Sequence, residues 1–233
     1  MPTALLIRHG RTAANAGGTL AGWTEGVALD EEGRTQVRAL ADRLDGLPVR
    51  RLVTSPLQRC RESAEVLAKP LNLEPGVVEE LGECRYGAWT GRAIKDLADE
   101  PLWRTVQDHP SAARFPESDD FAAESLSGMQ ARALAAVRRL DAEVEAEHGP
   151  DALWALVSHG DVIKAVVNDA VGAHFDHFQR IVVGPASLTV IRYTARRPFL
   201  ALLNDGGSDL AWLQPKDAPE VGAGDAPVGG GSS

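Results

Sequence analysis

Short apolar runs alternate along the chain with longer stretches in which apolar residues recur at helical spacing. Three of the runs are continuous enough to be buried strands: 5–7, 51–54 and 152–157. The helical stretches run from Asp30 to Leu44, Leu57 to Ala68, Leu126 to Val144 and Val162 to Ala170. Before the second of them, Ser55 is expected to be the helix cap and Pro56 the first helical position. Strands that alternate with helices predict parallel strands joined by right-handed crossovers. Two later runs, 188–193 and 199–203, are expected to form a final strand pair.

This order predicts an α/β fold, a three-layer α/β/α sandwich with a mostly parallel central sheet. The chain has 233 residues, and we expect one domain over 1–213. Three prolines break the helical pattern over 92–125, which predicts a helical lid inserted over the sheet, with a mobile acidic segment at 117–124. The segment 214–233 consists mainly of Gly, Ala, Asp, Pro and Ser, so we expect it to be a disordered tail.

The composition of the chain limits the classes of molecule that it is expected to bind. Lys and Arg total 24 against 33 Asp and Glu, a formal net charge of -9, so we expect no nucleic-acid partner. No apolar run approaches the roughly 20 residues of a membrane span, and no signal peptide is expected. The two cysteines, Cys60 and Cys84, have no metal-binding spacing and fit a reduced compartment, which predicts a cytoplasmic protein. The oligomeric state stays open.

Polar and charged residues follow each of the three predicted strands. Arg8-His9-Gly10 follows the first, Ser55-Pro56 and then Arg59 follow the second, and Ser158-His159-Gly160 follows the third. The carboxyl ends of parallel strands meet at one edge of the sheet, where ligands bind. Two arginines and two imidazoles at that edge would form an anion pocket, and Glu83, on a glycine-rich loop, is the nearest candidate acid.

The motifs also carry a resemblance. They are Arg8-His9-Gly10-Arg11-Thr12 with Asn15, Gly22-Trp23, Ser55-Pro56-Leu57-Gln58-Arg59-Cys60, Glu83 with Gly87, Trp89 and Gly91, and Ser158-His159-Gly160. In this order they resemble the histidine phosphatase superfamily, the phosphoglycerate-mutase-like proteins. The resemblance implies that His9 is a nucleophile that becomes phosphorylated. It also implies that Glu83 is the proton donor.

The remaining motif residues take binding roles in this resemblance. Arg8, Arg59 and His159 would hold the phosphoryl group, and Asn15 would assist. Gly160 is expected beside the phosphate, and Trp23 as a wall of the substrate pocket. Charge on the phosphoryl oxygens is stabilised by positioned cations, so the expected reaction needs no metal and no cofactor.

The expected reaction is hydrolysis of small phosphorylated metabolites through a phosphohistidine intermediate. The alternative is a cofactor-dependent phosphoglycerate mutase, which needs further cations for a second phosphate and a carboxylate. Here Cys84 stands where mutases of the family carry arginine, and Ala21 where a small hydroxyl residue is usual. Fewer cations favour water as the acceptor. Four aromatic residues were expected to suit a partly apolar leaving group: Tyr86, Trp89, Trp103 and Phe115.

Two other classes stay open. His9, His159 and Glu83 could form a metal site, although two neighbouring guanidinium groups would repel a cation. A non-catalytic phosphate-binding module would bind phosphate esters without turnover, but it has no need of a carboxylic acid beside a neutral histidine.

Overall fold

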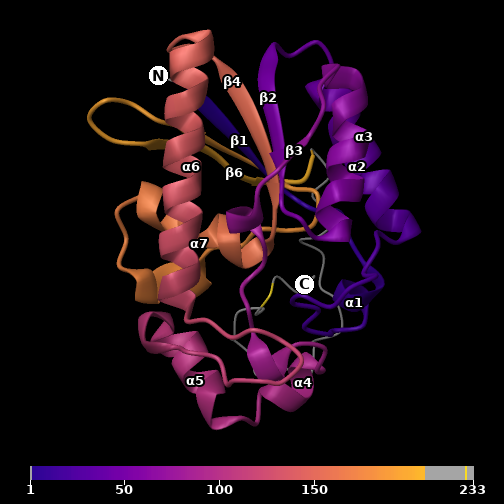
Figure 1. The fold of residues 1–233 in the computed structure, drawn as a ribbon, viewed down its shortest axis with the longest axis vertical. Helices are drawn as coiled ribbons and strands as arrows, with labels where there is room; N and C mark the ends of the chain where they lie inside the picture. Colours follow the sequence, from indigo (N-terminus) through magenta and orange to yellow (C-terminus); the bar gives the residue numbers. More distant parts are fainter. Residues whose placement is uncertain (1, 208–228, 230–233) are drawn as a thin grey trace.

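The computed structural model describes residues 2–207 and Gly229, so the predicted disordered tail over 214–233 lies outside the described residues apart from that glycine. Strands, helices and 3₁₀ helices follow one another along the chain (Figure 1). They are β1 (Thr3–Arg8), α1 (Ala13–Ala16), α2 (Glu31–Leu44), β2 (Val49–Thr54), α3 (Gln58–Leu71), β3 (Gly76–Val77), η1 (Glu79–Leu81), η2 (Gly87–Trp89), α4 (Ile94–Leu97), α5 (Pro101–Asp108), η3 (Pro110–Ala112), α6 (Leu126–His148), β4 (Leu153–Ser158), α7 (Gly160–Ala170), η4 (Phe175–Arg180), β5 (Leu188–Arg192) and β6 (Phe199–Asp205).

The sheet has six strands in the order β3-β2-β4-β1-β5-β6. The four strands β3, β2, β4 and β1 are parallel, whereas β5 pairs antiparallel with both β1 and β6. The predicted mostly parallel sheet is therefore confirmed. The strands with the most continuous apolar runs, β1 and β4, lie side by side at its centre, where both faces are covered.

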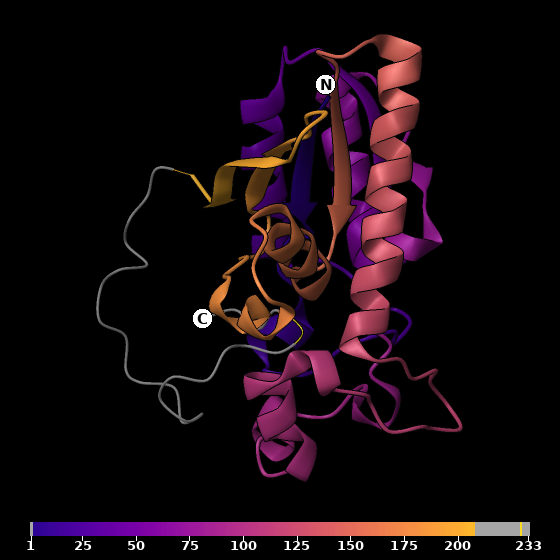
Figure 2. The same cartoon turned by 90° about the vertical axis from the view of Figure 1, so that its left-hand side faces the viewer.

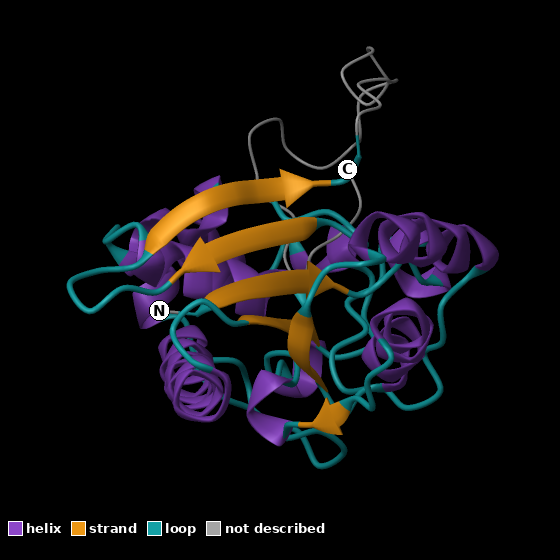
Figure 3. Cartoon of the chain, turned by 90° about the horizontal axis from the view of Figure 1, so that it is seen from above, coloured by secondary structure: helices purple, strands orange, loops and turns teal. Residues whose placement is uncertain are grey.

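Helices cover both faces of the sheet, as the view along the molecule's long axis shows (Figure 3). Leu5 and Ile7 of β1 pack into the core beneath α2 and α3, because alternate side chains of a strand point to opposite faces. The neighbouring Leu6 belongs to the core beneath α6 and α7. The three-layer sandwich is confirmed.

The start of α3 differs from the prediction. Ser55 does not cap the helix; Leu57 is the N-cap residue, and the helix begins at Gln58. The Ser55 hydroxyl instead accepts a hydrogen bond from the Leu57 amide at 3.3 Å and contacts His159. At the other end the helix includes Pro70, which has no N–H to donate to the preceding turn, and it ends at Leu71, with Asn72 as the C-cap at a left-handed φ of 52°.

The segment 92–125 lies beyond the carboxyl ends of the central strands, and Figure 2 shows the strand arrows pointing towards it. It contains the short helices α4, α5 and η3. Isolated bridges connect it to neighbouring loops, between Thr19 and Ala93 and between Tyr86 and Ala123. The acidic part, expected to be mobile, is held at Glu124, which bonds Arg132 at 2.6 Å.

The aromatic residues expected near a leaving group are instead core residues. Tyr86, Trp89, Trp103 and Phe115 are all at most 2% exposed. Phe115 contacts the rings of Tyr86 and Trp89 at centroid distances of 4.9 and 5.4 Å. That expectation was wrong, because these rings pack the base of the 92–125 segment rather than line an open site. No helix in the described part of the chain is long and apolar enough to cross a membrane.

Candidate active site

The residues after β1, β2 and β4 converge at one edge of the sheet. His9 and His159 follow the adjacent strands β1 and β4, and their ring centroids lie 5.3 Å apart. The backbone of His9 is fixed on both sides, since its amide donates to the Ser158 carbonyl at 3.0 Å and its carbonyl accepts from the Ala186 amide at 3.0 Å. The sequence prediction that parallel pairing brings the two imidazoles together is therefore confirmed.

His9 is oriented by a backbone bond. Its Nδ1 lies 2.7 Å from the carbonyl oxygen of Gly10, an atom that can only accept, so Nδ1 carries the proton and Nε2 keeps a lone pair. Burial, with Arg59 and Arg8 nearby, moves the pKa of His9 well below its ordinary value. The ring is therefore neutral at neutral pH and has a nucleophilic nitrogen on the side away from Gly10.

Gly10 also allows helix α2 to approach the turn that carries His9. A Cβ atom on Gly10 would lie 2.5 Å from the carbonyl oxygen of Gly33 and 2.8 Å from the Val37 side chain. Its amide donates to Ser63 Oγ on α3. Any larger residue at position 10 would push α2 away from the turn that carries His9.

Two buried guanidinium groups flank the histidines. Arg8 is fully buried and donates through Nη1 to the Val183 carbonyl at 2.7 Å. Arg59, in the first turn of α3, donates through Nη2 to the Gly22 carbonyl at 2.9 Å. Burial is the main cause that lowers the pKa of Arg8 to about 10, so Arg8 remains cationic at neutral pH. Cations at a helix N-terminus oppose its dipole, a cost that a bound anion would remove.

His159 contacts groups from β2 and α3. Its Nε2 lies 2.7 Å from Ser55 Oγ, and its Nδ1 lies 3.3 Å from Arg59 Nη2. Since a guanidinium only donates, Nδ1 is the acceptor and the proton of the neutral ring is on Nε2. Burial and then Arg59 move the pKa of His159 well below its ordinary value. Cys60 Sγ lies 3.4 Å from Nε2, and burial raises the pKa of that thiol to about 12, so it is no nucleophile.

Glu83 is 2% exposed, and its carboxyl group points back to its own turn, where Oε1 accepts from the Cys84 amide at 2.9 Å. Burial raises the pKa of Glu83 to about 7, with the charge of Asp161 as the next cause. The backbone of the turn is held from outside, because its carbonyl accepts from Trp23 Nε1 at 2.6 Å and from Arg132 Nη2 at 2.9 Å. A carboxylic acid in this state can donate a proton at neutral pH.

Three of the predicted site residues are less directly connected to the cluster of histidines and arginines. The side-chain oxygen of Asn15 accepts from the amide and hydroxyl of Thr12, which closes the cap of α1, so its predicted assistance to the phosphate stays a prediction. Gly160 is the buried first residue of α7. Trp23 lies between two cavities, with the guanidinium carbon of Arg85 4.7 Å from its ring centroid.

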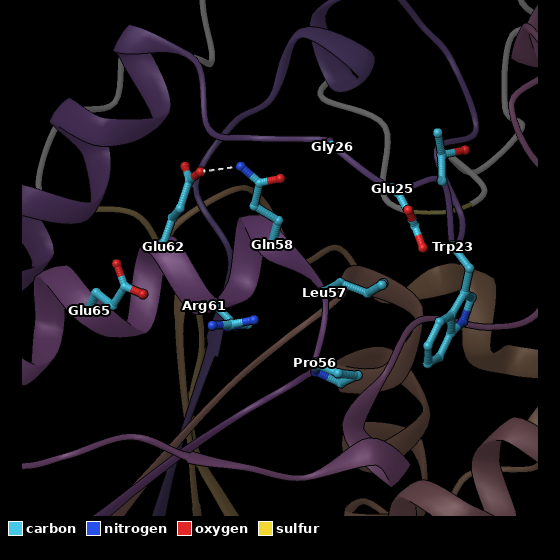
Figure 4. Close-up of a pocket in the computed structure, with 10 residues that line it drawn as sticks. Trp23, Glu25, Gly26, Pro56, Leu57, Gln58, Arg61, Glu62 and Glu65 are labelled. Atoms are coloured by element: carbon cyan, nitrogen blue, oxygen red, sulfur yellow. Dashed lines mark hydrogen bonds between the residues drawn. The ribbon is translucent and has the colours of Figure 1, made fainter.

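The larger cavity has a volume of about 580 Å³ and lies between Trp23 and the first turns of α3 (Figure 4). Arg61, Gln58 and Glu62 line its helical side, and Gln58 donates to Glu62 at 2.7 Å. Apart from Trp23, none of the predicted phosphate-binding residues lines it. The cavity therefore lies outside the buried cluster of His9, His159, Arg8 and Arg59.

Sequence reasoning missed the residues that hold the cluster in place. Asp161, directly after Gly160, is fully buried and accepts from the Tyr86 hydroxyl at 2.8 Å. Arg132 of α6 bonds three successive parts of the Glu83 loop, through the carbonyls of Glu80, Gly82 and Glu83. The signal for Asp161 was its position beside the histidine motif. No sequence signal could have identified Arg132, which lies on the polar face of a long helix.

The chemistry of the cluster suits an anion better than a metal. Within the residues that the structure describes, no group of three or more His, Cys, Asp and Glu side chains is arranged to hold a metal ion. Arg8 and Arg59 instead give the pocket two fixed positive charges beside two neutral imidazoles.

The chain matches known proteins over most of its length. The family model of the histidine phosphatase superfamily (branch 1) covers residues 4–206. A protein of Photorhabdus laumondii subsp. laumondii, named probable phosphoglycerate mutase GpmB, is 29% identical over 198 residues, which are 84% of this chain and 86% of that protein.

Solved structures show the same fold. Bacillus stearothermophilus YhfR is 25% identical with a TM-score of 0.76, and the match covers 88% of this chain and 98% of that one. The mycobacterial glucosyl-3-phosphoglycerate phosphatase Rv2419c is 25% identical with a TM-score of 0.74, covering 87% of this chain and 98% of that one.

Proposed function

Because the chain belongs to branch 1 of the histidine phosphatase superfamily, we propose that it is a phosphomonoesterase that hydrolyses small phosphorylated metabolites through a phosphohistidine at His9. The observation that carries the proposal is the orientation of His9. Its protonated Nδ1 faces the Gly10 carbonyl, so Nε2 is available to attack phosphorus. The buried guanidinium groups of Arg8 and Arg59 lie beside it, where charge develops on the phosphoryl oxygens.

In the first step, the lone pair of His9 Nε2 forms the bond to phosphorus as the bond from phosphorus to the ester oxygen breaks. That oxygen leaves with the bonding electrons and takes the proton of the Glu83 carboxyl group. A carboxylic acid with a pKa near the working pH is suited to this transfer, and the raised pKa of Glu83 meets that requirement.

In the second step, water attacks phosphorus while the Glu83 carboxylate takes its proton. The bond from phosphorus to Nε2 breaks, and its electrons return to the ring. His9 is then neutral again and Glu83 is protonated, so the cycle closes with phosphate as the product. His159 binds the phosphoryl group in both steps, since a neighbouring dianion favours its protonated, donating form.

Hydrolysis is favoured over mutase chemistry by the shortage of further cations. Cys84 follows the acid and is fully buried, so this position offers no charge to a second phosphate or a carboxylate. The segment before α6 adds Glu117, Asp119 and Asp120 and is acidic. The phosphatase named among the solved structures is consistent with this assignment, whereas the curated relatives are named as mutases.

The substrate is small in this proposal. The buried cluster would hold the phosphoryl group, and the cavity of about 580 Å³ beside Trp23, which lies within the range for small-molecule sites, would hold the rest of the substrate. We propose no nucleic-acid or membrane partner and a cytoplasmic location, in line with the acidic composition.

The test is release of phosphate from 4-nitrophenyl phosphate in the presence of EDTA, with the His9→Ala variant beside the natural chain. The natural chain should release phosphate and His9→Ala should not, while His109→Ala, at a surface histidine, should match the natural chain. Rapid quenching should trap phosphate on His9 in a form that is labile in acid and stable in base. Undiminished release by His9→Ala would overturn the mechanism.

The mutase alternative is tested in the same preparation. Transfer between the two positions of phosphoglycerate that is faster than phosphate release would replace the hydrolase assignment. Tight binding of phosphate esters with no turnover across a metabolite screen would instead favour a binding module. Activity that EDTA abolishes and zinc restores would favour a metal site.

A further inference from the structure

Asp161 brings a negative charge into a pocket whose other fixed charges suit an anion. It lies in the first turn of α7, two residues after His159, and is fully buried. Its Oδ2 accepts from the Tyr86 hydroxyl at 2.8 Å and from the Gly229 amide at 3.2 Å. Its Oδ1 accepts from Lys164 Nζ at 3.3 Å. Three donors surround the group, so it accepts in each of these hydrogen bonds.

Lys164 is equally confined. It lies one helical turn after Asp161, is 2% exposed, and donates to Gln179 Oε1 at 2.6 Å. Gln179 in turn donates to the Val106 carbonyl at 3.2 Å, and the ammonium lies 4.2 Å from the centroid of the Phe178 ring. The ammonium therefore has one fixed position. Burying such a pair costs more free energy than packing apolar residues of the same size, so its presence beside the site calls for a role.

Glu83 is the acid that this pair affects. Tyr86, three residues after Glu83, donates to Asp161, and His159, two residues before Asp161, lies 3.7 Å from Glu83 Oε2. The Asp161 and Glu83 side chains therefore belong to one buried cluster, with Lys164 bonded to Asp161. After burial, the charge of Asp161 is the next cause that raises the pKa of Glu83. Arg8 and Arg59 act in the opposite direction, since both favour the ionised form of Glu83. A phosphate pocket needs those two arginines, and without an opposing anion they would deprotonate the acid.

We propose that Asp161 and Lys164 are a positioning pair for Glu83: the carboxylate of Asp161 offsets the two arginines and keeps the Glu83 proton available to the leaving group, while Lys164 limits that effect. The proposal rests on the proposed function, because it assigns Glu83 as the proton donor. It makes Asp161 and Lys164 residues that act through another group and that form no bond with the reacting atoms.

The other groups around Glu83 belong to several elements. His159 follows β4, and its Nδ1 lies 3.7 Å from Glu83 Oε2. The remaining charged or titratable groups that act on Glu83 or border its loop are Arg8, Arg59, Cys60, Cys84, Tyr86 and Arg132. None of these changes in the two variants below, so a change in Glu83 is attributable to the altered pair.

The test compares Asp161→Asn with Lys164→Met, two variants of similar size that remove opposite charges. The readout is the alkaline limb of kcat/KM for a phosphate ester with a poor leaving group. Asp161→Asn should move this limb to lower pH by about 1 unit or more. Lys164→Met should move it to higher pH, because Asp161 keeps its bonds from the Tyr86 hydroxyl and the Gly229 amide while the opposing positive charge is lost.

The control is Asp141→Asn, which also removes a buried carboxylate but lies on α6 and bonds Trp154. It should leave the limb in place. Opposite shifts in the two variants support the pair. Shifts of the alkaline limb in the same direction, or equal losses of rate with no shift, would overturn the proposal. Loss of packing alone does not move the limb in opposite directions in the two variants. If Asp161→Asn does not fold, Lys164→Met alone is the test. An alkaline limb that stays in place or moves to lower pH in Lys164→Met would then reject the proposal.

A second readout does not depend on turnover. The side-chain carboxyl carbons of glutamate are labelled with ¹³C, the Glu83 signal is assigned by its loss in Glu83→Gln, and its titration is followed by NMR. The Glu83 titration should shift in the same opposite directions. If the natural chain hydrolyses no phosphate ester but these shifts occur, the proposed function fails and the pair stands. If hydrolysis occurs and the signal does not move in either variant, the pair fails alone.

Discussion

His159 Nδ1 lies 3.7 Å from Glu83 Oε2, and yet the two groups do not form an ion pair. Burial moves the pKa of His159 well below its ordinary value and raises the pKa of Glu83 to about 7, so each group is held towards its neutral form. The fixed charges that would meet a phosphate beside the two histidines are therefore those of Arg8 and Arg59. The proton on Glu83 remains available for transfer.

The first prediction concerns the leaving group. Glu83→Gln removes the transferable proton and keeps the shape of the side chain. For esters with poor leaving groups, the rate should fall by about 10²- to 10⁴-fold, the usual effect of losing a general acid. For 4-nitrophenyl phosphate, whose leaving group needs no proton, phosphorylation of His9 should be slowed far less. Single-turnover rates of His9 phosphorylation across a series of esters measure the difference, and equal losses across the series would make Glu83 a structural residue.

The second prediction concerns the pH profile of kcat/KM, which reports groups of the free enzyme. Glu83 must be protonated, so the profile for a poor leaving group should decline above about pH 7. His9 must be neutral, and since its pKa is lowered well below 6.5, the acid limb should lie well below that value. The Glu83→Gln variant should lack the alkaline limb. An alkaline limb that persists in Glu83→Gln would assign it to another group.

The third prediction separates charge from geometry at Arg59. Arg59→Lys keeps the cation and loses the planar pair of donors that reaches both Gly22 and a phosphoryl oxygen. We expect kcat/KM to fall by about 10²-fold or more, the scale of losing one transition-state donor. Arg38→Lys, on the neighbouring helix α2 and exposed, is the control and should keep activity within about twofold. Steady-state kinetics with one aryl phosphate measures both, and equal effects would remove Arg59 from the phosphate pocket.

The fourth prediction concerns the support of the Glu83 loop. Arg132→Met removes the bonds to the carbonyls of Glu80, Gly82 and Glu83 and should let the acid move. Because a small misplacement of a catalytic group is costly, kcat should fall by about 10- to 100-fold for a poor leaving group. Binding of inorganic phosphate, measured by calorimetry, should change little. Arg138→Met, whose guanidinium is on the same helix, exposed and bonded to Asp169 instead, is the control and should not affect either quantity.

The amino-acid pattern was sufficient to predict the helices and strands that have a regular hydrophobic period, and the parallel pairing that follows from their order. β1 and β4 could be predicted because their apolar runs are continuous, and parallel pairing then brings His9 and His159 to one edge. The position of Arg59 at the same edge could be predicted in the same way, because it follows β2, which pairs in parallel with β4. The start of α3 could not be predicted, since Ser55 and Pro56 are typical of a helix start but Ser55 instead contacts His159.

The rest of the site depends on contacts between segments far apart in the chain. Arg132 lies 49 positions from Glu83, and no local pattern on α6 distinguishes it from the other arginines of that helix. The role of Tyr86 was missed for the same reason, because its ring belongs to the core while its hydroxyl reaches Asp161 on α7. Such pairings require tertiary structure, whereas motif residues at strand ends do not.

The last prediction is a pH dependence of stability that isolates Glu83. Its folded pKa is about 7, against an ordinary value of 4.5, so the unfolded chain ionises at this position first. Between these two values the folded state binds more protons than the unfolded state, and the free energy of unfolding must fall as the pH rises. Below pH 4.5 the effect is absent, and above about pH 7 it is complete.

Glu83→Gln has no such group and is the reference. Relative to this variant, the natural chain should lose about 1–3 kcal/mol of unfolding free energy between pH 4.5 and 8. Urea unfolding at several pH values measures both proteins, with Glu79→Gln as the control because Glu79 is on the same loop and exposed. That control should follow the natural chain. A difference between natural chain and Glu83→Gln that stays constant with pH would mean that Glu83 is ionised in the folded protein, and the acid would then have to be assigned to another residue.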